Sequence, residues 1–115
     1  GEMWASLRAA LALAREAEAA LQQAWLQGDA LSGAERAALG LLVGAARVQA
    51  GRSALEVTSR ILELTGARSA QSRLRLDRYW RNVRVHTLHD PLDWRAAEAG
   101  RWLLTGEAPA PSSYG

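Results

Sequence analysis

Apolar residues recur in steps of three or four through the first 25 residues, and this spacing constrains the fold more than any other feature of the chain. The stripe consists of Trp4, Leu7, Leu11, Ala14, Ala17, Leu21 and Trp25. Such spacing places the residues along one face of an α-helix. We therefore predict a helix over residues 3–26, about 36 Å long at about 1.5 Å per residue.

Glycines and capping patterns divide the rest of the chain into further helices. Ser32 precedes Glu35 by three residues, and Ser53 precedes Glu56 in the same way. A serine followed by glutamate at this distance is the capping box that begins a helix. The pattern predicts helices over residues 32–50 and 53–65, a fourth that runs through residue 74 to about residue 85, and a last one over residues 94–106.

Several glycines have an assigned place in this prediction. Gly51 is expected to end the second helix and Gly66 the third, because glycine is common just after the last helical turn. Gly40 and Gly44 lie one turn apart, which predicts a close crossing of two helices where a side chain would clash.

No segment alternates convincingly between apolar and polar residues as a strand does, so the predicted fold class is all-α, an antiparallel up-down four-helix bundle. Residues 1–106 are predicted to form one helical-bundle domain. Residues 107–115 are predicted to form an irregular tail.

The composition narrows the possible functions. The chain has no cysteine, which excludes disulfides and thiolate metal sites. All 14 basic residues are arginine, against 12 acidic residues, and the two signs alternate along the helices. This pattern disfavours nucleic-acid binding. Charges within residues 1–27 argue against a signal peptide or a membrane span, so we expect a cytoplasmic protein.

The supply of large apolar side chains is limited. Phenylalanine is absent and alanine is abundant, and alanine buries little area per residue. We expect the five tryptophans and the leucines to form most of the core. The alternative is that a partner surface completes the core.

The two histidines of the chain form the most unusual local feature. His86 and His89 lie three residues apart, directly before Asp90 and Pro91. Three interpretations stay open from the spacing alone. The pair could hold a metal ion, although a third ligand would have to come from elsewhere. They could be ordinary half-buried or capping histidines, or imidazoles that face a ligand cleft as acid–base groups.

The loop at residues 66–73, with the sequence GARSAQSR, is a second candidate site. Free N–H groups at a helix start attract phosphate, and Arg68 could bind it through two hydrogen bonds, with Ser69 nearby. The alternative is an ordinary loop in which Ser69 or Ser72 caps the next helix.

Residues 76–106 read LDRYWRNVRVHTLHDPLDWRAAEAGRWLLTG and are preceded at residues 63–70 by ELTGARSA. This combination resembles the C-terminal helical domain of the acyl-CoA dehydrogenase-like flavoprotein superfamily. Within it, the chain is most similar to the branch of flavin-dependent monooxygenases that includes dibenzothiophene monooxygenases and sulfur-acquisition oxidoreductases. The specific part of the resemblance covers residues 62–106, and residues 3–50 match only in helical character and composition.

The resemblance implies a three-part flavoenzyme that assembles as a dimer or tetramer. The N-terminal helical domain and the β domain would be missing from this chain, or supplied by a companion chain. Arg68 would contact the flavin phosphate across a subunit boundary, with Ser69 close by. His89 would face the isoalloxazine ring and the substrate as the catalytic residue, and His86 is the weaker candidate. FMN is favoured over FAD, and a separate reductase would supply reduced flavin.

Two alternatives remain beside the monooxygenase. The first is a true acyl-CoA dehydrogenase. In that branch of the superfamily the chain carries a Tyr-Glu-Gly-Thr segment, and many members use its glutamate to abstract a proton. Here the corresponding place reads His89-Asp90-Pro91, which disfavours dehydrogenation of a thioester. The chain could also be a helical self-association module without catalysis. In each case we expect the chain alone to be inactive. The sequence does not determine the substrate, the choice between FMN and FAD, the oligomeric state, or whether the chain is a fragment.

Overall fold

The computed structural model describes residues 1–109 and is all-α, as predicted. Four α-helices form it, with short 3-10 turns between them. Their bounds are Glu2–Gln27 for α1, Gly33–Thr65 for α2, Asp77–His89 for α3 and Leu92–Thr105 for α4. The 3-10 turns are η1 (Gly28–Ala30), η2 (Ala67–Ala70) and η3 (Ser72–Leu74).

The helix ends follow two of the predicted signals. Ser32 begins α2 with a full capping box, in which its hydroxyl accepts from the Glu35 N–H at 3.2 Å and its own N–H donates to Glu35 Oε2 at 2.8 Å. Gly66 ends α2 with φ at 74°, a backbone conformation that favours glycine. The local sequence therefore sets both ends of this helix.

The predicted break at Gly51 is wrong, because α2 continues for 33 residues from Gly33 to Thr65. Ser53 is a buried residue inside the helix and not its cap. Its hydroxyl donates to the Ser6 carbonyl at 3.2 Å and accepts from the Ser6 hydroxyl at 2.9 Å. Ser53 thus connects α1 and α2, although its position before Glu56 resembles a helix cap in the sequence.

The predicted fourth helix begins later than expected. The turns η2 and η3 occupy residues 67–70 and 72–74, and Arg75 follows with φ at 49°, a left-handed conformation that interrupts the helix. The α3 helix then starts at Asp77. An Asp77–Arg81 ion pair of 2.8 Å, one turn apart, supports its first turn.

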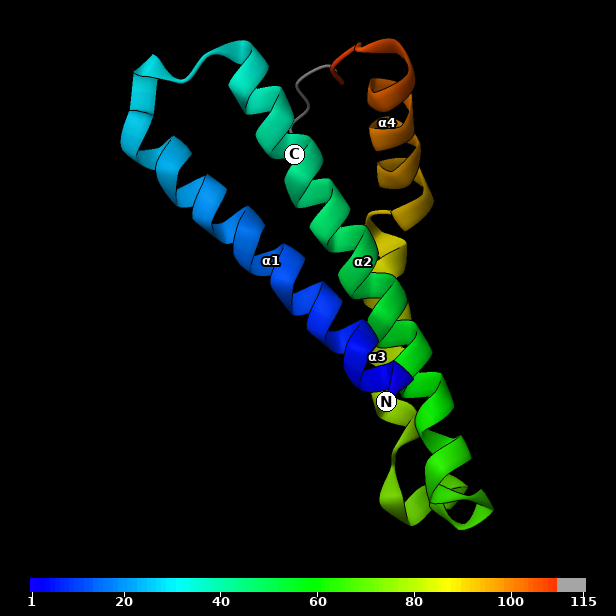
Figure 1. Ribbon diagram of the computed structural model, residues 1–115. Coiled ribbons are helices and arrows are strands. Elements are labelled where there is room, and N and C mark those ends of the chain that lie inside the picture. Colours follow the sequence, from blue (N-terminus) through cyan, green and yellow to red (C-terminus); the bar gives the residue numbers. More distant parts are fainter. Residues whose placement is uncertain (110–115) are drawn as a thin grey trace.

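The α2 helix is the central element, since α1, α3 and α4 all pack against it (Figure 1). The α1 and α2 helices form an antiparallel hairpin. The α3 and α4 helices follow one another along α2 in the opposite direction to it (Figure 1). The result is an elongated molecule with extents of 55 × 24 × 24 Å.

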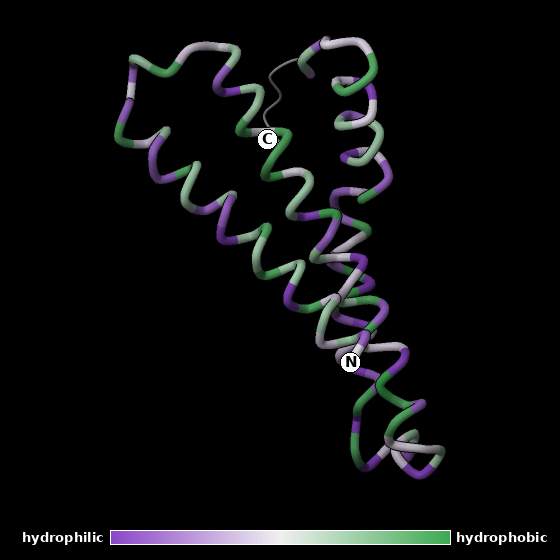
Figure 2. The backbone as a smooth tube through the Cα atoms, in the orientation of Figure 1, coloured by the Kyte–Doolittle hydropathy of each residue, from purple (hydrophilic) through white to green (hydrophobic). Residues whose placement is uncertain are grey.

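The core within the chain is small. Its buried hydrophobic residues among the described part are Ala10, Ala17, Leu41 and Ala46. The prediction that the five tryptophans and the leucines form most of the core is wrong for a single chain. All five tryptophans are exposed, Trp4 at 68% and Trp25 at 82%, and Leu41 is the one leucine among the buried residues of the described part. Figure 2 shows hydrophobic stretches spread along all four helices rather than gathered in one place.

The close approach between helices lies at Gly51 and not at Gly40. A Cβ atom at Gly40 would meet nothing within 4 Å, and at Gly44 it would meet the Arg95 side chain at an ordinary 3.8 Å. At Gly51 it would lie 2.7 Å from Leu92 Cδ1. The start of α4 therefore packs on α2 at this glycine.

Among residues 1–109, no helix combines the length and the apolar character needed to cross a membrane.

Candidate functional site

The turn between α3 and α4 carries the His89-Asp90-Pro91 sequence. His89 is the last residue of α3, and Asp90 adopts an extended conformation with φ −139° and ψ 96°. The helical conformation is disfavoured for the residue before a proline, which accounts for the end of α3 at this point. The sequence signal and the structure agree on this break.

The Asp90 carboxylate joins three helices. Its Oδ2 atom lies 3.0 Å from Arg47 Nε of α2 and accepts a 3.0 Å hydrogen bond from Arg95 Nε of α4. The Arg47 contact is an ion pair only, because its Nε–H is not aligned for a hydrogen bond. The hydrogen bond to Asp90 raises the pKa of Arg95, which keeps the guanidinium charged.

Arg47 also holds the end of α3 through the backbone. Its Nη2 atom donates to the Asp90 carbonyl at 3.3 Å and lies 3.5 Å from the His86 carbonyl, also as a donor. The last carbonyl groups of a helix have no partner within the helix, so this guanidinium caps α3 from a neighbouring element. The turn is therefore fixed by charge and by backbone hydrogen bonds.

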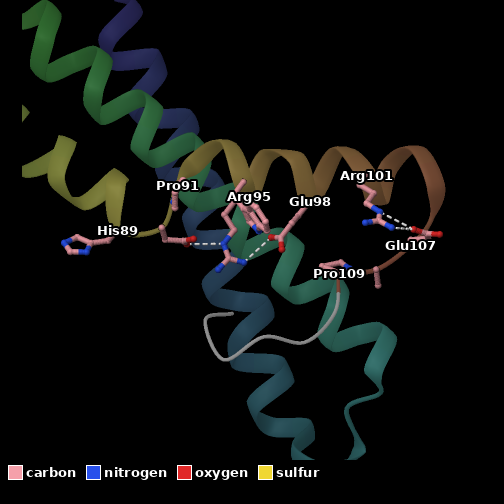
Figure 3. A pocket seen from close by; sticks show the side chains of 10 residues that line it. His89, Pro91, Arg95, Glu98, Arg101, Glu107 and Pro109 are labelled. Atoms are coloured by element: carbon pink, nitrogen blue, oxygen red, sulfur yellow. Dashed lines mark hydrogen bonds and ion pairs between the residues drawn. The ribbon is translucent and has the colours of Figure 1, made fainter.

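A hollow of about 760 Å³ opens beside this turn. Its walls include the turn itself and the α4 residues Trp94, Arg95, Glu98 and Arg101. Arg95 Nη1 donates to Glu98 at 3.1 Å (Figure 3). The exposed His89 ring lies at the outer edge and points away from Arg95 and Glu98 (Figure 3).

The two histidines line different hollows. His86 lines one of about 620 Å³ between α1, α2 and α3, whose other walls include many alanines. Both side chains are exposed. Within the described part of the chain, no three histidine, cysteine or acidic side chains lie together in a way that could hold a metal ion.

Arg68 and Ser69 lie in η2, directly after α2. The Ser69 side chain is buried, donates to the Gly66 carbonyl, and lies 2.6 Å from the Thr65 hydroxyl. Arg68 is exposed, and its guanidinium has no ion pair or hydrogen bond to another residue of the range 1–109. The structure thus presents Arg68 outward and uses the Ser69 hydroxyl within the loop.

Arg68 and His89 are not brought together within one chain. Arg68 precedes the start of α3 and His89 is its last residue, and the 13 residues of this helix span roughly 20 Å at about 1.5 Å each. One compact site made of both residues is therefore not formed by a single copy of these helices.

Sequence reasoning missed Arg47 and Arg95. A signal for Arg47 was available, since it is the one charged residue in the small and apolar stretch LLVGAARVQAG at residues 41–51. A long cation in such surroundings requires an anionic partner. The spacing could not show that the partner of Arg47 is Asp90, which lies 43 residues away.

Comparisons with known proteins place these observations in context. A family model described as "Acyl-CoA dehydrogenase, C-terminal domain" matches residues 1–94. The "Probable FMNH2-dependent monooxygenase SfnC" of Pseudomonas putida is 45% identical over 114 residues, which are 99% of this chain and 29% of that protein. A dibenzothiophene monooxygenase of Mycolicibacterium goodii is 46% identical over 111 residues, 96% of this chain and 27% of that protein.

A solved structure agrees with the whole arrangement of helices. The FMN-bound TdsC of Paenibacillus sp. A11-2 aligns with a TM-score of 0.94 at 39% identity, over 100% of this chain and 29% of that one. The chain thus spans less than a third of the length of each of these relatives.

Proposed function

Because the chain belongs to the family of acyl-CoA dehydrogenase C-terminal domains, we propose that it acts as the C-terminal helical part of an FMN-dependent monooxygenase. The observation that carries the proposal is the agreement of all of its helices with part of an FMN-bound relative, at a TM-score of 0.94 and 39% identity. In this role the chain supplies part of the flavin site and an interface between subunits.

FMN, when bound, supplies the redox chemistry of the reaction. Arg68 suits its phosphate group, because an exposed guanidinium without a partner among residues 1–109 is available for two charged hydrogen bonds. We also propose that Ser69 lies beside that phosphate. Contact through its hydroxyl would require release of the bonds to Gly66 and Thr65.

His89 is the proposed acid–base residue. Its exposed ring has no bonded partner among the described residues, and an imidazole is a side chain that can act as a general acid or base. His86 stays the weaker candidate, since it lines the other hollow. The distance from Arg68 to His89 supports an arrangement in which Arg68 reaches the flavin of a neighbouring subunit while His89 serves its own.

Self-association to a dimer or tetramer is part of the proposal. Large hydrophobic side chains remain exposed, including Trp25 at 82% near the end of α1 and Leu104 at 89% near the end of α4. An apolar surface of this kind is typical of an interface. The remaining partners are an N-terminal helical domain, a β domain and a flavin reductase. The cytoplasmic location stays a prediction, as does the division into a domain at residues 1–106 and a tail at residues 107–115, of which residues 110–115 lie outside the described part.

The ion pairs of Asp90 disfavour the acyl-CoA dehydrogenase alternative. This carboxylate is engaged by two guanidinium groups and faces α2 and α4, so it is not free to take a proton from a substrate. The non-catalytic self-association module stays the second candidate, because the exposed apolar side chains suit it equally well.

A chimera tests the proposal. The chain would replace the matching segment of the FMN-bound Paenibacillus protein, and FMN binding would be measured by fluorescence titration of the parent chimera, Arg68→Gln and Arg73→Gln. Arg73 is the matched control, because it lies in the same loop but donates to Gln71 at 2.7 Å. We expect Arg68→Gln to weaken FMN binding about tenfold or more, since a hydrogen bond to a charged group contributes roughly 1.5–3 kcal/mol.

Arg73→Gln should leave FMN binding within about twofold of the parent. If the assembled chimera binds no FMN, the monooxygenase role fails and the self-association module is favoured. If both arginine variants bind FMN as tightly as the parent, Arg68 does not hold the phosphate.

A further inference from the structure

The α3–α4 turn is held far more firmly than the histidine that it carries. Asp90 contacts guanidinium groups from two other helices, each at 3.0 Å. Leu92, two residues further on, packs against Gly51 of α2. The His89 ring, by contrast, has no bonded partner among residues 1–109 and is exposed. The backbone is fixed while the imidazole stays available.

Two helices contribute one arginine each to this arrangement. Arg47 comes from the middle of α2 and Arg95 from the first turns of α4, and their side chains are only 28% and 15% exposed. Ion pairs at such partly buried positions are screened less by solvent than surface pairs. Removal of one arginine leaves the partly buried Asp90 carboxylate with one guanidinium partner instead of two, so its charge is less well compensated.

We propose that Arg47 and Arg95 are positioning residues that fix the His89 imidazole at the flavin site through their shared contact with Asp90. The inference rests on the proposed function, in which His89 faces the flavin. Arg47 fixes the end of α3 through the His86 and Asp90 carbonyls, and Arg95 fixes the start of α4 against the same carboxylate. Neither arginine needs to touch substrate or flavin.

The first experiment uses the chain itself. Amide hydrogen exchange across residues 86–92 would be measured by NMR for the parent, Arg47→Gln, Arg95→Lys and Arg101→Gln. Arg101 is the matched control, because it lines the same hollow but pairs with Glu107. Loss of the Arg47 contacts should speed exchange at the turn about tenfold, which corresponds to roughly 1.4 kcal/mol.

Arg95→Lys retains the charge and should speed exchange less than Arg47→Gln, whereas Arg101→Gln should leave it unchanged. Unchanged exchange at the turn in folded Arg47→Gln and Arg95→Lys would overturn the proposal. Equal acceleration in all three variants would overturn it as well, because the effect would not be specific to the Asp90 contacts.

The second experiment measures catalysis in the chimera with the Paenibacillus protein. Misplacement of a catalytic group by about 1 Å lowers the rate by as much as roughly a hundredfold. We therefore expect Arg47→Gln to lower kcat roughly ten- to a hundredfold, with the KM for reduced flavin within about twofold. Arg95→Lys, which retains the charge, should lower kcat less than Arg47→Gln. A change in KM alone, or no change in kcat, would refute the positioning role. A parent chimera that binds no FMN would refute the proposed function instead, and the exchange data on the chain would then decide whether the arginines hold the turn.

Discussion

Gly51 provides a sharp test of how α4 packs on α2. Replacement by alanine would place a Cβ atom 2.7 Å from Leu92 Cδ1, 3.1 Å from Leu92 Cδ2 and 3.2 Å from Thr87 Cγ2. Leu92 can move the end of its side chain, but Thr87 is β-branched and only 4% exposed. The new methyl group therefore has to displace atoms from two elements at once.

Two opposing effects determine how much Gly51→Ala changes the free energy of unfolding. Overpacking of this kind costs roughly 1–3 kcal/mol. Alanine inside a helix is favoured over glycine by about 1 kcal/mol. We expect Gly51→Ala to lower the free energy of unfolding by about 1 kcal/mol, the difference between the middle of the first range and the second value.

Gly40→Ala is the matched control on the same helix. A Cβ atom there meets nothing within 4 Å, so only the propensity gain of up to about 1 kcal/mol remains. Urea denaturation followed by circular dichroism should thus separate the two variants by about 2 kcal/mol. In a Leu92→Ala background only the 3.2 Å approach to Thr87 Cγ2 remains, so Gly51→Ala should be less destabilising than in the parent chain. Equal stabilisation by both alanines in the parent chain would refute the close approach of α4 to Gly51.

Three further outcomes are expected. Ser32→Ala should lower the free energy of unfolding by about 1 kcal/mol through loss of the cap, measured by urea denaturation, and an unchanged midpoint would contradict the capping role. The hydrogen bond from Arg60 lowers the pKa of Glu2, so this pair stabilises the fold above the ordinary glutamate pKa and loses its effect as pH falls through the lowered one. Glu2→Gln should therefore flatten the acid limb of a stability–pH curve, and an unaltered limb would speak against the pair. Leu104, which is 89% exposed, should mediate assembly, and Leu104→Ser should shift sedimentation velocity profiles toward the monomer without loss of helicity.

Local signals in the sequence identified much of the fold. The capping box at Ser32, the glycine at the end of α2 and the break before Pro91 each depend on neighbours within a few residues, and all three are present. The resemblance to the acyl-CoA dehydrogenase C-terminal domain is confirmed by the family match over residues 1–94. These features were predictable because short-range geometry decides them.

The errors arose where distant residues decide the outcome. Ser53 and Glu56 repeat the capping pattern, yet Ser53 bonds to Ser6, which lies 47 positions away. Gly51 looks like a helix end in the sequence, whereas the atoms that crowd this position belong to the distant residues Thr87 and Leu92. No local pattern contains that information.

The candidate site was predictable in part for the same reason. The chemistry of His89 and Arg68 was visible from residue types and from the resemblance, and their roles stay proposals. The partners of Asp90 were not visible, because Arg47 and Arg95 come from different helices. The spacing of His86 and His89 left a joint metal site open, whereas the structure has the two side chains line separate hollows.

The central position of α2 has a consequence for protease susceptibility. The α1 helix on one side and the α3–α4 arm on the other each pack mainly on α2 (Figure 1). Either side can therefore detach while the other stays docked, and a nick in the linker at residues 28–32 should release α1 without freeing the arm that carries His89. Limited digestion followed by mass spectrometry would reveal this as a stable fragment that begins near Gly33.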